Sequence, residues 1–166
     1  MVRHWITPTS AEAWSFVRKH NLYAFREESH RDKVSLGDLF LFYLRRSQPP
    51  IFVGVYEVSG SWSRTQDLSW PDEIAKGEII YPWTFRLTPR LVGRADVRKL
   101  VPALSFVKNK ANWQHHFVGS LGNYGKPISE DDYKVVEEEL QRSSDSSISS
   151  LKGIFQHLYF KTKEAK

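Results

Sequence analysis

The strongest constraint on the fold is a run of consecutive apolar residues, Leu39-Phe40-Leu41-Phe42-Tyr43-Leu44, which follows a Gly37-Asp38 turn. An uninterrupted apolar run of this kind is typical of a strand that is buried on both faces. After the Gln48-Pro49-Pro50 turn, residues 51–58 predict a second strand, and Gly54 within it indicates a bend or bulge where a barrel curves. We therefore expect a curved sheet that is covered on both sides.

The remaining patterns place helices and further strands around these two. Residues 4–7 predict a short strand, and Thr9 and Glu12 have the spacing of a capping box before a helix over residues 10–20. Shorter helices are expected over residues 96–104 and from Ser129 onward. In residues 79–87 the side chains that share one face of a predicted strand are Tyr81, Trp83, Phe85 and Leu87. The order β-α-β-β-β indicates an α+β fold.

The composition favours a single soluble domain with an anionic partner. The chain has 166 residues, of which 40% are hydrophobic, and no apolar run reaches the roughly 18 residues of a membrane span. The lack of cysteine excludes disulfides and thiolate metal sites, and Pro8 comes too early for a signal peptide, so we expect a cytoplasmic protein. The net charge of +5 favours an anionic partner, and several of the aromatic residues lie in polar surroundings.

Seven segments form a series whose order and spacing carry more information than any one of them. They are Trp5-Ile6, Lys19-His20-Asn21-Leu22-Tyr23, Val34-Ser35-Leu36-Gly37-Asp38, Phe52-Val53-Gly54-Val55-Tyr56-Glu57-Val58, Tyr81-Pro82-Trp83, Phe106-Val107-Lys108-Asn109-Lys110-Ala111-Asn112-Trp113 and Glu130-Asp131-Asp132-Tyr133. The series resembles the EVE domain family, a relative of the YTH and PUA domains. This resemblance implies that residues 1–141 form a PUA-like curved, mixed β-barrel with peripheral helices, and that the domain binds nucleic acid.

The resemblance also implies a pocket for one base. YTH domains hold a methylated base between aromatic rings, and EVE domains are similar to readers of modified bases, so the implied partner is RNA or DNA with a modified base. The implied pocket residues are Tyr23, where the family usually carries Trp, and Trp62 or Trp70 as the two jaws, Thr7, Thr9 and Asn21 at the rim, and Trp5 and Trp83 in the core or the pocket floor. The alternative is that the two loop tryptophans pin the long loop of residues 59–77 to the barrel.

A second candidate surface interleaves cations and amides with an aromatic ring. Such a surface suits a phosphate backbone, because phosphate contacts hold the register while a pocket reads the base. Its residues are Lys108, Asn109, Lys110, Trp113, His115 and His116, with Arg45, Arg46 and Arg64 as extensions if folding brings them near. The alternative is a solvated loop that Trp113 anchors.

The sequence offers little for catalysis or metal binding. His115-His116 has no cysteine or nearby carboxylate cluster to complete a metal site, and residues 119–125 lack the lysine-serine ending of a phosphate-binding loop. We find no nucleophile elbow and no triad spacing, so we expect no catalytic residues, no metal and no cofactor. The alternative, an enzyme that acts on nucleic acid, would need paired carboxylates or a histidine–carboxylate pair around the pocket.

The C-terminal part lies outside the resemblance. Residues 142–150 predict a serine-rich linker, and residues 151–166 predict an amphipathic helix. The apolar stripe of this helix consists of Leu151, Ile154, Phe155, Leu158 and Tyr159. It can dock on its own domain, or it can support a homodimer or another protein interaction.

Overall fold

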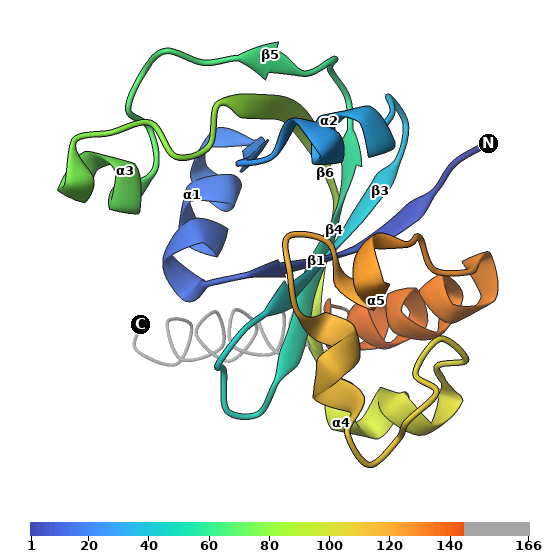
Figure 1. Cartoon of the computed structure of the whole chain (residues 1–166). Coiled ribbons are helices and arrows are strands. Elements are labelled where there is room, and N and C mark those ends of the chain that lie inside the picture. Colours follow the sequence, from blue (N-terminus) through green and yellow to red (C-terminus); the bar gives the residue numbers. More distant parts are fainter. Residues whose placement is uncertain (145–166) are drawn as a thin grey trace, which may run out of the picture.

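The strands of the protein form one mixed sheet in the computed structural model, which describes residues 1–144. The strands are β1 (His4–Thr9), β2 (Leu22–Phe25), β3 (Leu39–Leu44), β4 (Ile51–Val58), β5 (Ser63–Arg64) and β6 (Trp83–Asp96). Their order is β1-β3-β4-β6-β2, and β5 also pairs with β6. β1 runs parallel to β3, and the other paired strands are antiparallel. The sheet curls into a half-barrel (Figure 1), which confirms the predicted α+β class with a curved mixed sheet.

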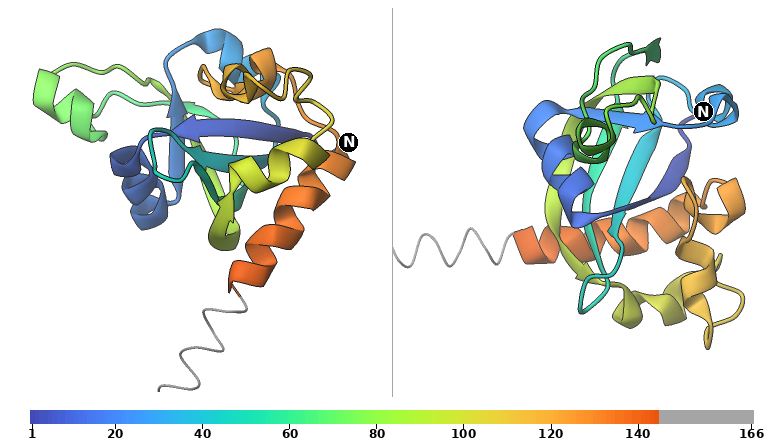
Figure 2. Two further views of the ribbon diagram at one scale, coloured as in Figure 1. Left: turned by 90° about the horizontal axis from the view of Figure 1, so that it is seen from below. Right: turned by 60° about the vertical axis from the view of Figure 1, so that its left-hand side comes forward.

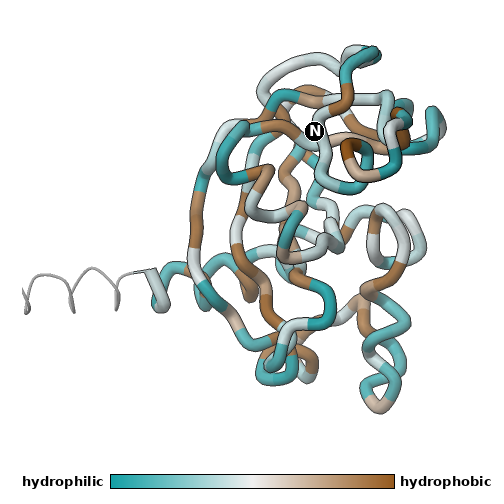
Figure 3. Tube along the Cα trace, turned by 90° about the vertical axis from the view of Figure 1, so that its left-hand side faces the viewer, coloured by the Kyte–Doolittle hydropathy of each residue, from teal (hydrophilic) through white to brown (hydrophobic). Residues whose placement is uncertain are grey.

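β3 is buried on both faces, as its apolar run predicts. Phe40 and Phe42 belong to one hydrophobic core, and Leu41 and Tyr43 belong to a second core on the other face of the strand. Because successive side chains of a strand point to opposite faces, an element that serves two cores has no face left for polar residues. The hydrophobic residues accordingly follow the strands in Figure 3.

The helices cover the sheet from two sides (Figure 2). They are α1 (Ala11–His20), α2 (Glu28–Lys33), α3 (Pro71–Lys76), α4 (Val97–Leu100), the 3-10 helices η1 (Val101–Ala103) and η2 (Trp113–Phe117), α5 (Gly122–Gly125) and a helix over residues 130–144. Val17 of α1 is buried in the first core, whereas Val136 and Leu140 of the 130–144 helix are buried in the second core. Within residues 1–144, no helix is both long enough and apolar enough to cross a membrane.

β6 is the longest strand and joins β2 and β5 to the rest of the sheet. Its first residues pair with β2 and β5, and its later residues pair with β4. The predicted bend at Gly54 coincides with register shifts on both sides of β4, and a side chain there would lie 2.8 Å from the Leu91 carbonyl oxygen. Only glycine therefore allows the two strands to approach this closely.

Several elements begin elsewhere than the sequence predicts. The strand expected over residues 79–87 starts at Trp83 and continues to Asp96, because the N–H groups of residues 80 and 81 donate to a carboxylate instead of to a neighbouring strand. Ser10, not Thr9, caps α1, since its Oγ accepts from the Ala13 N–H at 3.1 Å. Residues 142–144, at the start of the predicted linker, continue the 130–144 helix. The rest of that linker and the predicted helix of residues 151–166 lie outside the described residues.

Candidate functional site

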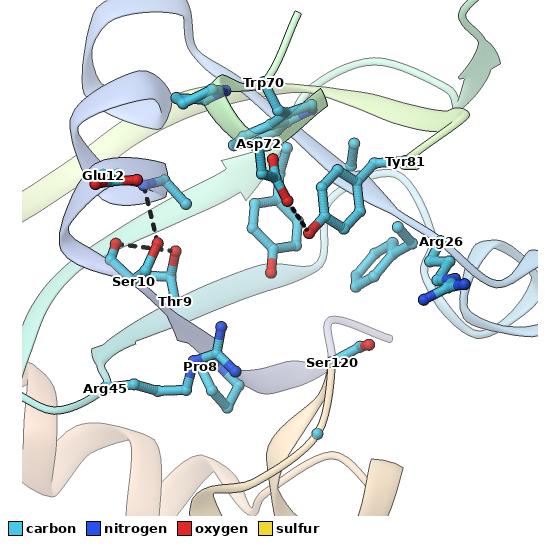
Figure 4. Close-up of a pocket in the computed structure, with 16 residues that line it drawn as sticks. Pro8, Thr9, Ser10, Glu12, Arg26, Arg45, Trp70, Asp72, Tyr81 and Ser120 are labelled. Atoms are coloured by element: carbon cyan, nitrogen blue, oxygen red, sulfur yellow. Dashed lines mark hydrogen bonds between the residues drawn. The ribbon is translucent and has the colours of Figure 1, made fainter. Parts of the chain in front are cut away.

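A cavity of about 430 Å³ opens between the start of α1, β2, the start of α3 and residues 119–120 (Figure 4). Pockets for small ligands commonly measure about 300–1,000 Å³. The cavity is lined by Pro8, Thr9, Ser10, Glu12, Ala13, Tyr23, Ala24, Phe25, Arg26, Arg45, Trp70, Pro71, Asp72, Tyr81, Gly119 and Ser120. The fold thus gathers one site from segments spread over most of the domain.

Three of these residues, Tyr23, Trp70 and Tyr81, form an aromatic wall. The Trp70 ring packs on Phe16 of α1, with 4.2 Å between the ring centroids and 34° between the planes. It meets the Tyr23 ring at 6.0 Å and 85°, and the Tyr81 ring at 5.9 Å and 70°. Tyr23 and Trp70 therefore form two sides of a corner instead of two parallel faces.

A buried carboxylate fixes this wall. Glu73, which has no exposed surface, accepts hydrogen bonds from the backbone N–H groups of Trp70 at 3.0 Å, Ile80 at 2.8 Å and Tyr81 at 3.2 Å. Hydrogen bonds to a charged acceptor are among the stronger ones in proteins. Because they join the start of α3 to the segment before β6, they hold Trp70 and Tyr81 in a fixed relation.

The two tyrosine hydroxyls stay protonated at neutral pH. The Tyr81 hydroxyl donates to Asp72 Oδ2 at 2.7 Å, and burial together with this bond raises the pKa of Tyr81 to about 12. Burial also raises the pKa of Tyr23, although the charge of the nearby Arg45 opposes the increase. The Tyr23 hydroxyl can therefore serve as a neutral donor at the cavity wall, whereas the Tyr81 hydroxyl already donates to Asp72 and can only accept from a ligand.

Positive charge lies at the cavity mouth. Arg45 and Pro8 lie across the cavity from Trp70, and Arg26 extends β2 at the side (Figure 4). Arg26 and Arg45 are exposed, and no carboxylate of residues 1–144 forms an ion pair with either. Their charges are therefore available to an anionic ligand.

The structure brings together three of the residues assigned to the base pocket. Tyr23, Trp70 and Thr9 line the cavity. Trp62, the other loop tryptophan, lies outside it and meets Trp83 at 5.2 Å, also outside the cavity. Their roles in a binding site stay predictions, but the position of Trp70 makes it the loop tryptophan that can contact a ligand in the cavity.

The other three assigned residues do not line the cavity. Trp5 is buried in the first core, where its indole N–H donates to Asp38 Oδ2 at 2.9 Å. Asn21 is the exposed C-cap of α1. Thr7 is fully buried, and its hydroxyl has no hydrogen-bond partner among residues 1–144.

The predicted phosphate-binding segment lies apart from the cavity and partly serves the fold. The Lys110 ammonium donates to the carbonyl oxygens of Val101 at 3.0 Å and Leu104 at 2.6 Å. Trp113 packs against Phe117 at 5.5 Å, and His116 is buried, which lowers its pKa. Among the remaining members, Lys108, Asn109 and His115 are exposed, Arg45 lines the cavity, Arg46 is exposed next to it in the chain, and Arg64 lies over Trp83.

The cavity residues that sequence patterns did not assign to a site include Arg26, Asp72, Tyr81 and Ser120. The sequence does contain a signal that Tyr81 lies outside the strand: Pro82 has no N–H to donate to a sheet ladder and so separates Tyr81 from the residues that pair. The other three lie in segments with no distinctive spacing.

The cavity holds no recognisable catalytic set. The carboxylates among its lining residues are Glu12 and Asp72, there is no histidine, and Asp72 accepts the Tyr81 hydroxyl. Over residues 1–144, no group of three or more His, Asp or Glu side chains could hold a metal ion.

The chain is similar in sequence to one protein family and similar in fold to several solved structures. The model of the EVE domain matches residues 3–139. A UPF0310 protein of Saccharolobus solfataricus is 24% identical over 84% of this chain and 96% of its own length. The fold is similar to the Mmi1 YTH domain in a complex with RNA (TM-score 0.62, 11% identity, 88% of this chain and 82% of that one). It is also similar to the YTH domain of Zygosaccharomyces rouxii MRB1 in a complex with N6-methyladenosine RNA (TM-score 0.59, 15% identity, 84% of each chain). These likenesses confirm the predicted fold.

Proposed function

Because this chain belongs to the EVE domain family, we propose that it is a nucleic-acid-binding module that takes one base, modified in its natural target, into the cavity beside Trp70. The observation that carries the proposal is the combination of an aromatic corner with unpaired arginines at the mouth of one cavity. The YTH domains of similar fold, whose structures are complexes with RNA, support it.

The aromatic corner suits a flat ligand. A base that stacks on one ring of the corner turns its own edge toward the face of the other ring, and stacking on an aromatic side chain contributes about 1–3 kcal/mol per base. The hydroxyls of Thr9, Ser10 and Tyr81 and the carboxylate of Asp72 supply acceptors and donors for the base edge. Arg26 and Arg45 then face the phosphates on either side of the base.

Burial alone gives little selectivity for a modification. One added methyl group contributes about 0.8 kcal/mol, or roughly fourfold in affinity. Strong preference for a modified base therefore requires that polar groups of the cavity disfavour the unmodified base. Asp72 contributes to this preference where the modification adds a hydrogen-bond donor, because its carboxylate accepts such a bond, whereas a methyl group that replaces an N–H has the opposite effect.

The proposal is tested by fluorescence anisotropy with single-stranded RNA and DNA of about nine nucleotides that carry methylated or unmodified central bases. Tyr81→Ala removes one ring of the wall and Arg45→Gln removes a charge at the mouth. We expect Tyr81→Ala to weaken binding of the preferred strand by at least about fivefold, because the cavity loses the ring beside Trp70 and the hydroxyl that holds Asp72.

The matched control is Arg98→Gln. Arg98 is an exposed arginine on α4 and does not line the cavity. Its replacement lowers the net charge of the protein by the same amount as Arg45→Gln does, but leaves the cavity intact. If Tyr81→Ala and Arg45→Gln bind as tightly as Arg98→Gln, the cavity is not the binding site, and the proposal fails.

A further inference from the structure

A second aromatic surface lies outside the cavity, where β5 pairs with β6. Trp62, just before β5, is 41% exposed, and its ring meets the ring of Trp83 edge to face. Arg31 of α2 lies over both rings, with its guanidinium carbon 4.2 Å from the centroid of Trp62 and 4.8 Å from that of Trp83. Arg64 of β5 lies over Trp83 at 5.5 Å. We call these four residues the tryptophan–arginine cluster.

The cluster and the cavity meet at β2. Trp83 pairs with Phe25, which lines the cavity, and Arg26 at the cavity mouth follows directly in the chain. Residues paired across antiparallel strands have Cα atoms about 4.5–5.5 Å apart. The cluster therefore adjoins the cavity at this pair of strands, next to Arg26.

Arg64 is the cation of the cluster that is available to an anionic strand. Arg31 forms ion pairs with Glu28 and Asp32, both at 2.8 Å, so two carboxylates surround its single positive charge. Arg64 forms no ion pair with a carboxylate of residues 1–144. Because the charges of the two arginines and the two carboxylates sum to zero, the attraction for a phosphate comes from the exposed Arg64 itself and not from a net positive charge.

We infer that the tryptophan–arginine cluster is a second stacking site, which binds a nucleotide that flanks the base in the cavity of a single-stranded nucleic acid. The inference rests on the proposed function. Stacking on Trp62 accepts any base, because every base has a flat face, so this site adds affinity without reading sequence. Arg64 contacts the neighbouring phosphate.

The test compares a strand with a single nucleoside. The wild type, Trp62→Ala and Trp62→Phe are each titrated with two kinds of probe. One is a single-stranded RNA or DNA of about nine nucleotides, and the other is the nucleoside that corresponds to its central base. We expect Trp62→Ala to weaken strand binding by at least about fivefold and to leave nucleoside binding unchanged, because only the strand reaches the second site. Trp62→Phe keeps a stacking face and should restore most of the affinity.

Leu68→Ala is the control, because Leu68 is 43% exposed in the same loop and lies outside the cluster. Equal strand affinity of wild type and Trp62→Ala overturns the inference while the proposed function stands. A loss of nucleoside binding in Trp62→Ala also overturns it, since the cluster would then act by anchoring the loop of residues 59–77, which carries Trp70. If the wild type binds none of the probes, the proposed function fails and the inference fails with it.

Discussion

At the scale of single residues, the carboxylate of Glu73 organises the cavity although it does not line it. Its two oxygens together accept from the N–H groups at the start of α3 and just before β6. A glutamine of the same shape has one oxygen and one NH2 group, and the NH2 group would face backbone donors. Leaving a buried donor without a partner costs about 1–3 kcal/mol.

Glu73→Gln should therefore lower the free energy of unfolding by about 2 kcal/mol or more, because at least one backbone donor loses its acceptor in a fully buried site. Urea denaturation followed by circular dichroism measures this loss. Glu78→Gln, at an exposed position of the same segment, is the control and should unfold like the wild type. A Glu73→Gln midpoint equal to that of the control would contradict the role given to Glu73.

The choice between Trp62 and Trp70 shows where residue-level prediction stops. Both tryptophans lie in the predicted loop, and their neighbours in sequence do not distinguish them. What separates them is long-range packing: Trp70 is held against Phe16 and by the Glu73 hydrogen bonds, whereas Trp62 is held by Arg31. None of these contacts follows from a local pattern.

At the scale of elements, the sequence predicted best where one periodic pattern decides the structure. The apolar run of β3 and the helical spacing in α1 depend on burial, which the pattern records directly. β2 and the start of β6 were harder to predict from the sequence. The short β2 forms a strand only because it pairs with residues 83–86 of β6. The resemblance implied a pocket with Thr9, Tyr23 and Trp70, which line the cavity, whereas Arg26 and Ser120 reach it only through long-range packing that no local pattern records.

At the scale of the whole molecule, buried histidines link stability to pH. Burial lowers the pKa of His4, His30 and His116. An imidazole in the unfolded chain takes up its proton near pH 6.5, whereas these groups do so only at lower pH in the folded protein. The unfolded state therefore binds more protons in this range, so the free energy of unfolding falls as the pH falls through about 6.5.

The urea midpoint should accordingly be lower at about pH 5.5 than at about pH 7.5. His4→Phe should reduce the difference, because the ring keeps its stack on Tyr133, whose centroid lies 4.4 Å away, but no longer titrates. His20→Gln, at an exposed histidine of α1, is the control and should leave the difference unchanged. A midpoint that is constant or higher at the lower pH would refute this link between burial and stability.

The most direct measurement of the central claim is an NMR titration of the 15N-labelled protein with a single-stranded RNA or DNA that it binds. The largest amide shifts are expected at Thr9, Ser10, Arg45, Tyr81 and Ser120, which surround the cavity on four separate segments. Smaller shifts should extend to Trp62 and Arg64. Shifts concentrated in residues 108–116 or on the 130–144 helix, with the cavity residues unchanged, would contradict a base-binding cavity.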